Sequence, residues 1–167
     1  MSDDADRPKR SLVFGAGNRL KTDDGAGLLV LDYLRAHDPG LGAVADLEDG
    51  GLAGADVLPL FSGRDRIVII DAVLSGGEPG SVVAYVPDRS TPWPPRFSLH
   101  QAGPLEALAQ LALAGCRPDV RVVGIVAQDV DSPGLEPTPR VAAAIPEAAR
   151  AVRAALAGAF PGRGSVR

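Results

Sequence analysis

Short apolar runs alternate along the chain with longer stretches in which apolar residues recur at helical spacing. The apolar runs predict strands at 11–14, 43–49, 66–73, 81–87 and 120–128. The helical spacing predicts helices at 27–37, 55–63, 104–115 and 139–160. Because strands that alternate with helices pack in layers, the pattern predicts an α/β protein built as a three-layer sandwich.

Local signals refine three of the predicted helices. We expect the third helix to end at Gly115, a glycine C-cap. Pro146 either kinks the last helix or starts it afresh. The expected apolar stripe of the first helix consists of Ala26, Leu29, Val30, Tyr33 and Leu34.

The chain of 167 residues, 46% of them hydrophobic, is long enough to form one domain with a full core. We expect this domain to span 11–160, between disordered tails at 1–10 and 161–167. The 20 glycines and 15 prolines fall between apolar runs and indicate turns. The single cysteine, Cys116, excludes an internal disulfide and a cysteine-based zinc site. Together with the polar N-terminus, it favours a cytoplasmic protein.

Charge and hydropathy exclude two classes of partner. The formal net charge is −4 and the pI is about 5.1, whereas non-specific nucleic-acid binding needs a basic face. No apolar stretch approaches the roughly 18 residues of a membrane span. We therefore expect neither a nucleic acid nor a membrane as a partner.

A glycine-rich loop, GAGNRLKTDDGAG at 15–27, follows the first predicted strand. Such loops often bind phosphate, but the dinucleotide-binding pattern needs glycine where Leu20 stands, and no P-loop motif is present. Its two acids, Asp23 and Asp24, would also repel phosphate. The pair is explained either by helix capping or by a role in a site, and one acid can cap while its neighbour points elsewhere.

Asp71 and His100 stand beside predicted strand or helix ends. Asp71 is expected to close an apolar strand, where a carboxylate is costly unless it is paired, hydrogen-bonded or bound to a cation. Capping of nearby backbone N–H groups is the alternative explanation. His100 stands in SLHQAG, just ahead of a helix. His37, in contrast, is best explained as a cation near the end of the first helix.

Asp49, Gly50 and Gly51 close the second predicted strand. They form either a turn or a place where backbone approaches a ligand closely. No Gly-x-Ser-x-Gly motif is present, and Cys116 has no evident partner histidine, so nucleophilic hydrolysis is not favoured.

Asp24, Asp71 and His100 together supply two carboxylates and an imidazole from three strand-end regions. Functional residues of open α/β sheets lie beyond the carboxyl ends of the strands, so these three are candidates for one site. Such a donor set suits a divalent first-row metal with coordination positions left open.

Five motifs, in order, resemble those of the hydrogenase maturation endopeptidases, which process the large subunit of nickel–iron hydrogenases. They are GAGNRLKTDDGAG, EDGG, IIDAV, SLHQAG and GLEPTPRV at 134–141. The resemblance extends from about residue 11 to residue 156. It implies a phosphorylase/hydrolase-like α/β/α sandwich with a mixed five-stranded sheet in the order 2-1-3-5-4, strand 4 being antiparallel. The pattern by itself also allows a hairpin between the third and fourth strands.

The same resemblance implies that Asp24, Asp71 and His100 bind nickel and are the catalytic residues. Many family members carry glutamate in place of Asp24; aspartate is one methylene shorter, which leaves geometry and metal choice open and keeps Asp23 as a rival. Close backbone approach and N–H donors are expected from the supporting loops, which contain Gly17, Asn18, Asp23, Asp49, Gly50, Gly51 and Gln101.

The implied activity is removal of a C-terminal tail from a nickel-loaded precursor of the NiFe-hydrogenase large subunit. The nickel is that of the precursor, and other divalent metals are alternative occupants. Either the metal polarises the scissile carbonyl or a carboxylate activates water, as in an aspartyl protease. The segment 90–98, with Trp93 and Phe97, is either a substrate-recognition loop or an ordinary surface loop.

Two other classes of function compete with this interpretation. One is a nickel-sensing chaperone of the same fold that does not cleave. The other is a small-molecule hydrolase or a nucleotide-binding protein, against which the acidic loop and the missing phosphate motif both argue.

Overall fold

A mixed five-stranded sheet forms the centre of the fold in the computed structural model, which describes residues 10–51, 57–87 and 102–159. The strands are β1 (Ser11–Ala16), β2 (Asp46–Gly51), β3 (Arg66–Val73), β4 (Val82–Tyr85) and β5 (Asp119–Val126). Their order is β2-β1-β3-β5-β4, and β4 pairs antiparallel with β5 while the other pairs are parallel. This confirms the expected order. The alternative of a hairpin between β3 and β4 is excluded, because β5 lies between these two strands.

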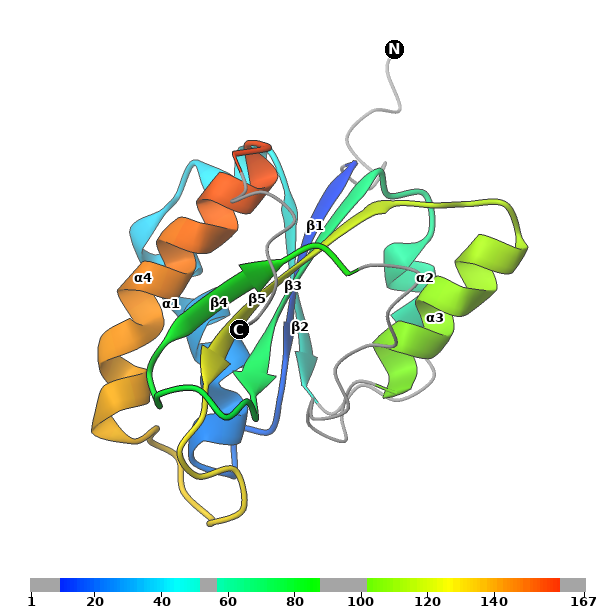
Figure 1. Ribbon diagram of the computed structural model, residues 1–167. Coiled ribbons are helices and arrows are strands. Elements are labelled where there is room, and N and C mark those ends of the chain that lie inside the picture. Colours follow the sequence, from blue (N-terminus) through cyan, green and yellow to red (C-terminus); the bar gives the residue numbers. More distant parts are fainter. Residues whose placement is uncertain (1–9, 52–56, 88–101, 160–167) are drawn as a thin grey trace.

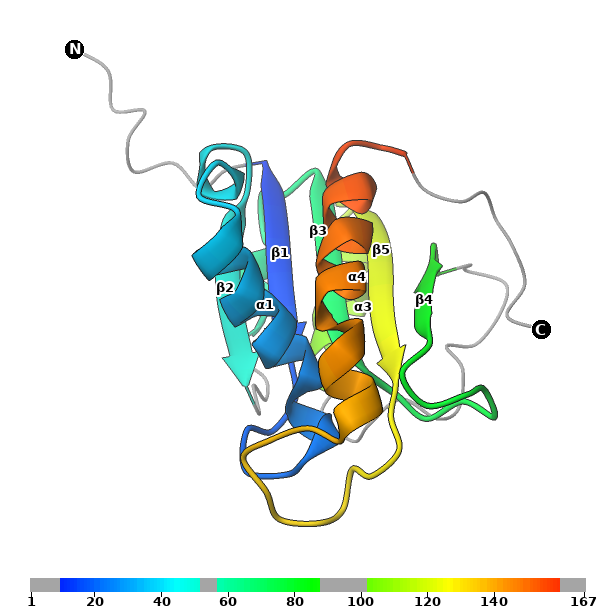
Figure 2. The same ribbon diagram turned by 90° about the vertical axis from the view of Figure 1, so that its left-hand side faces the viewer.

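Helices cover both faces of the sheet (Figure 1). On one face lie α1 (Ala26–His37) and α4 (Pro139–Leu156), and on the other lie α2 (Leu58–Phe61) and α3 (Ala102–Leu113). Figure 2 shows α1 and α4 side by side against the sheet, with β2 and β4 at its two edges. The predicted three-layer sandwich is confirmed.

The side chains of β3 point alternately to the two faces of the sheet and contribute to a hydrophobic core on each. Val68 and Ile70 pack toward α1 and α4, whereas Ile67 and Ile69 pack toward α2 and α3. Successive side chains of a strand point to opposite faces, so Asp71 shares the face of Ile67 and Ile69.

The third strand has its predicted bounds, 66–73, but Asp71 does not close it. β3 runs on through Ala72 to Val73, and Asp71 pairs with Gly124 inside the ladder with β5. The strand continues because Ala72 and Val73 are also buried, and Ala72 belongs to the core under α1 and α4.

The second strand is shifted along the chain from its expected position at 43–49. Leu41–Ala43 form a 3-10 turn, and β2 begins only at Asp46. It then continues through Gly50 to Gly51, which pairs with the end of β1. The strand thus includes the segment read as a turn, although Gly51 has a φ of 45° and its pairing with β1 is irregular.

The buried face of α1 differs from the expected stripe. Leu28 and Leu31 are buried, whereas Leu29 and Tyr33 are only half-buried. The rotation of the helix is set by Gly27, where a Cβ would lie 2.4 Å from backbone oxygens of β1 and β3. Since no side chain fits there, this residue must face the sheet.

The remaining helices keep their predicted places with altered ends. α3 closes as expected at Gly115, which has a φ of 80°, while the next N–H, of Cys116, donates to the Leu111 carbonyl at 2.8 Å. α4 runs unbroken through Pro146. α2 is only one turn long, and residues 52–56 lie outside the described ranges. No helix of the described residues has the length and apolarity that crossing a membrane requires.

Candidate functional site

The glycine-rich loop after β1 folds over the backbone of Asp24. The N–H of Gly17 donates to Gly51 O at 3.2 Å, and the N–H of Asn18 donates to Asp24 O at 3.1 Å. Gly17 has a φ of 131°, and a Cβ there would lie 2.0 Å from the same carbonyl oxygen. Only glycine fits this position. The loop thus connects the end of β2 to the backbone of Asp24.

Three aspartates of the described residues are buried. Asp23 and Asp71 are fully buried, and Asp24 is 2% exposed. Asp23 and Asp24 belong to a 3-10 turn, η1 (Asp23–Gly25), that contacts β3, the strand of Asp71. Because burying a carboxylate is costly, three of them at the carboxyl edge of one sheet mark that edge as a candidate site.

The Asp23 carboxylate joins the loop after β1 to the segment between β5 and α4. Its Oδ2 accepts the N–H groups of Gln128 and Asp129 at 2.8 and 2.9 Å and the hydroxyl of Thr138 at 3.0 Å. Its Oδ1 accepts the N–H of Thr138, the N-cap residue of α4, at 2.7 Å. Asp23 therefore bonds N–H groups, as the capping interpretation requires, but those of α4 and its preceding loop rather than those of α1.

Asp71 lies beside Tyr85 of β4. Its Oδ1 accepts the N–H of Ala72 at 2.7 Å. Burial raises the pKa of Tyr85, and the nearby charge of Asp71 raises it further. The phenol is therefore protonated at neutral pH. Sequence analysis missed Tyr85, because only the pairing of β4 with β5 brings it to the face of Asp71.

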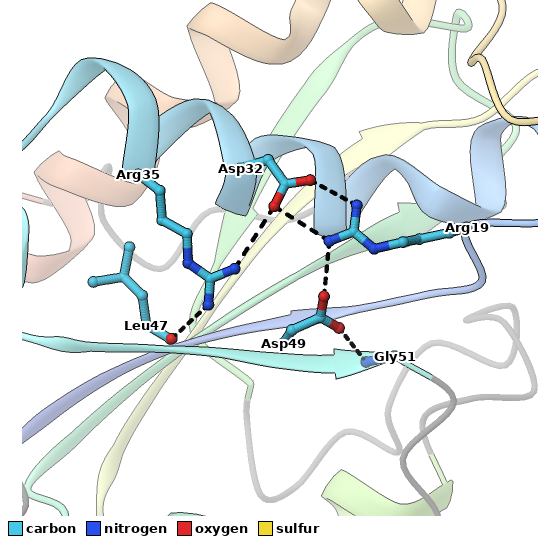
Figure 3. Close-up of polar contacts among 6 residues, drawn as sticks. All are labelled: Arg19, Asp32, Arg35, Leu47, Asp49 and Gly51. Atoms are coloured by element: carbon cyan, nitrogen blue, oxygen red, sulfur yellow. Dashed lines mark hydrogen bonds and ion pairs between the residues drawn. The ribbon is translucent and has the colours of Figure 1, made fainter.

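Arg19 ties the first loop to α1 and β2 (Figure 3). Its guanidinium donates to both carboxylate oxygens of Asp32, at 2.6 and 3.2 Å, and to Asp49 Oδ2 at 2.7 Å. Asp49 Oδ1 in turn accepts the N–H of Gly51 at 3.0 Å. Hydrogen bonds to Asp32 and Asp49 raise the pKa of Arg19 above its usual value. Sequence analysis missed Arg19, because Asp32 and Asp49 are 13 and 30 residues away along the chain.

Gly50 has a packing role that explains its place in the EDGG motif. A Cβ at Gly50 would lie 2.1 Å from the ring of Phe14. Phe14 packs edge-to-face on Phe61, with ring centroids 5.2 Å apart. The close approach inferred for this glycine is therefore an approach to the core.

His100, Gln101 and the segment 90–98 with Trp93 and Phe97 lie outside the described residues. Within the described ranges, no group of three His, Cys, Asp or Glu side chains could hold a metal ion. The chemistry of the expected donor set still suits a divalent first-row metal, since imidazole and carboxylates are its usual ligands. A complete set depends on His100.

His37 has the surroundings of a helix-terminal residue. It is the last residue of α1, its Nδ1 lies 3.0 Å from Tyr33 O, and its ring stacks on that of Tyr33 at 4.1 Å. These contacts agree with its interpretation as a residue of the helix end.

Comparison with known families and sequences shows where this chain has relatives. The model of a family described as hydrogenase maturation protease matches residues 35–155. The chain is 31% identical over 150 residues to the hydrogenase 2 maturation protease of Escherichia coli (strain K12), covering 88% of this chain and 90% of that protein. It is 32% identical over 155 residues to the hydrogenase expression/formation protein HupD of Rhodobacter capsulatus, covering 89% and 73%.

Solved structures agree with the sequence comparisons. The hydrogenase maturating endopeptidase HybD from E. coli superposes with a TM-score of 0.75 at 29% identity, covering 89% of this chain and 93% of that one. The [NiFe] hydrogenase maturation protease HybD from Thermococcus kodakarensis superposes with a TM-score of 0.69 at 29% identity, covering 86% and 97%.

Proposed function

The chain belongs to the hydrogenase maturation protease family, and from this premise we propose that it removes a C-terminal extension from the nickel-loaded precursor of a NiFe-hydrogenase large subunit. Proteins named as hydrogenase maturation proteases match nearly the whole chain, both in sequence and in fold. We also assign the reaction to the cytoplasm, as the sequence favours.

One observation carries this proposal: Asp24 and Asp71 are buried on contacting elements at the carboxyl edge of the sheet. In the proposed complex these two carboxylates and the imidazole of His100 contact the nickel of the precursor. A precursor without nickel could not form these contacts. Cleavage would then follow metal loading.

Peptide hydrolysis adds the hydroxyl of a water molecule to the scissile carbonyl carbon and a proton to the departing nitrogen. A carboxylate at this edge can accept the proton of the attacking water, which would make the enzyme an aspartyl-type protease. Polarisation of the carbonyl by the precursor's nickel is the other route. Under both routes Asp71 and Asp24 are required.

The test uses purified large-subunit precursor prepared with and without nickel. Each preparation is incubated with the enzyme, and its mass is measured by intact mass spectrometry. We expect loss of the tail only from the nickel-loaded precursor. Stable binding without any loss of mass would instead identify a chaperone of this fold.

Two variants test the assigned residues in the same assay. Asp71→Asn and His100→Gln should each lower the processing rate at least about a hundredfold, the scale on which catalytic groups act. His37→Gln is the matched control and should process normally, because His37 ends α1 and contacts Tyr33 of the same helix. Full processing by a folded Asp71→Asn protein would remove Asp71 from the site.

A further inference from the structure

A pocket of about 210 Å³ opens beside η1. Thr22 and Gly25 line it and stand on either side of Asp23 and Asp24 in the chain, so the pocket adjoins the candidate site. Neither the fold nor the proposed nickel contacts account for it. Its lining residues are Arg19, Thr22, Gly25, Leu29 and Leu135.

The walls of the pocket come from two loops that are bonded to each other. The N–H of Gly134 donates to Leu20 O at 3.0 Å, and the N–H of Thr22 donates to Ser132 O at 3.2 Å. The hydroxyl of Thr22 also donates to Asp129 O at 2.6 Å. Figure 2 shows both loops together beyond the same edge of the sheet. Leu135, next to Gly134, is therefore held in place although it is 74% exposed.

Arg19, the charged residue of the lining, does not indicate an anionic ligand. The guanidinium of Arg19 is already engaged by the carboxylates of Asp32 and Asp49 (Figure 3). The other large side chains of the lining, Leu29 and Leu135, are apolar, and Leu20 on the adjoining loop is 66% exposed. Exposed apolar side chains gathered around a pocket mark an interaction site.

We propose that this pocket is a substrate subsite that receives one apolar side chain of the precursor, close to the bond that is cut. The inference rests on the proposed function. A pocket of about 210 Å³ has room for one large side chain and too little for a helix about 10 Å across. Thr22 and Gly25 line the pocket and flank Asp23 and Asp24 in the chain, so a peptide bound at Asp24 can place a neighbouring side chain in the pocket.

The experiment measures KM and kcat for tail removal with Leu135→Glu, and with Leu113→Glu as the matched control. Leu113 is 89% exposed at the end of α3, which leads into the start of β5 and so lies at the opposite edge of the sheet. Leu135→Glu should raise KM about tenfold to a hundredfold, the effect of withdrawing one apolar side chain from its pocket, with kcat changed less than about twofold. Leu113→Glu should change neither constant. Equal KM values for the two variants would overturn the subsite.

A second arm identifies the precursor residue that occupies the pocket. Alanine is substituted at each apolar residue flanking the cut, and KM is measured with the wild-type enzyme and with Leu135→Ala. One precursor substitution should raise KM for the wild type but have little further effect with Leu135→Ala, since contacting residues are not additive. Additive effects at every position would overturn the subsite. A wild-type enzyme that leaves the tail in place would instead refute the proposed function.

Discussion

Asp23 and Asp24 are adjacent in the chain and buried alike, and the hydrogen bonds of Asp23 indicate a structural role for it. The carboxylate of Asp23 accepts four hydrogen bonds from Gln128, Asp129 and Thr138 and so fastens η1 to α4. We assign the structural role to Asp23 and the contact with the precursor's nickel to Asp24.

Asparagine substitutions should separate these two roles. Asp23→Asn should lower the free energy of unfolding by about 2–4 kcal/mol, because an amide offers one acceptor atom in place of two and loses the charge that strengthens the bonds. Asp24→Asn should lose more processing activity and less stability. Thermal unfolding and the tail-removal assay measure the two effects. The reverse ranking in both assays would show that the proposed nickel contact is assigned one residue too late.

At the scale of elements, Gly27 lets α1 pack closely against β1 and β3. Gly27→Ala would place a Cβ 2.4 Å from the carbonyl oxygens of Ala16 and Ile70. Overpacking of this kind costs about 1–3 kcal/mol, and we expect that loss in a denaturant titration. Gly42→Ala is the control, since nothing lies within 4 Å of a Cβ there. Equal stability of the two variants would mean that α1 can shift on the sheet without cost.

The start of β5 is stabilised by charge at the edge opposite the candidate site. Asp119 Oδ2 accepts hydrogen bonds from Arg66 and Arg121 at 3.0 and 2.9 Å. Burial alone would raise the pKa of Asp119, but the bonds from Arg121 and Arg66 outweigh it and hold that pKa below the usual value. A carboxyl whose pKa is lowered by folding stabilises the protein above its unfolded pKa of about 3.9 and loses this contribution as pH falls through the folded value.

Asp119→Asn should therefore reduce the acid sensitivity of folding. Between about pH 5 and pH 2 the wild type should lose more stability than the variant, by less than about 1 kcal/mol because the pair is partly exposed. Urea titrations at each pH measure the difference. Parallel pH profiles would show that the two arginines do not discriminate between charged and neutral Asp119.

At the scale of the whole molecule, two hydrophobic cores lie on opposite faces of one sheet. Leu31 belongs to the core under α1 and α4, and Phe61 to the core under α2 and α3. Strands β1, β3 and β5 contribute to both. Because each core needs the same strands, the two should not unfold separately, as a single domain requires.

Calorimetry should accordingly show one transition. Leu31→Ala and Phe61→Ala should each cost about 2–5 kcal/mol and shift that transition as a whole. A second peak in either variant would show that one layer unfolds on its own and would contradict the single domain expected at 11–160.

The sequence by itself determined the order and type of the elements, and with the resemblance the strand order of the sheet. Periodicity is a local property, so it survives in the chain without its neighbours. Asp71 could be singled out for the same reason, since a carboxylate at the end of an apolar run is visible in the sequence alone. Asp24 stood out in the glycine-rich loop and His100 just ahead of a predicted helix, and the roles of all three stay predictions.

Only the tertiary structure decided what each of these residues touches. Asp23 bonds a residue 115 positions away, and Arg19 bonds one 30 positions away. The buried face of α1 was set by Gly27 against β1 and β3, which left Leu29 beside the pocket instead of in the core. Strand ends moved because pairing with a neighbour, rather than local propensity, decides how far a strand extends. Contacts between distant segments leave no periodic signal, so the partners of these side chains emerge only once the chain is folded.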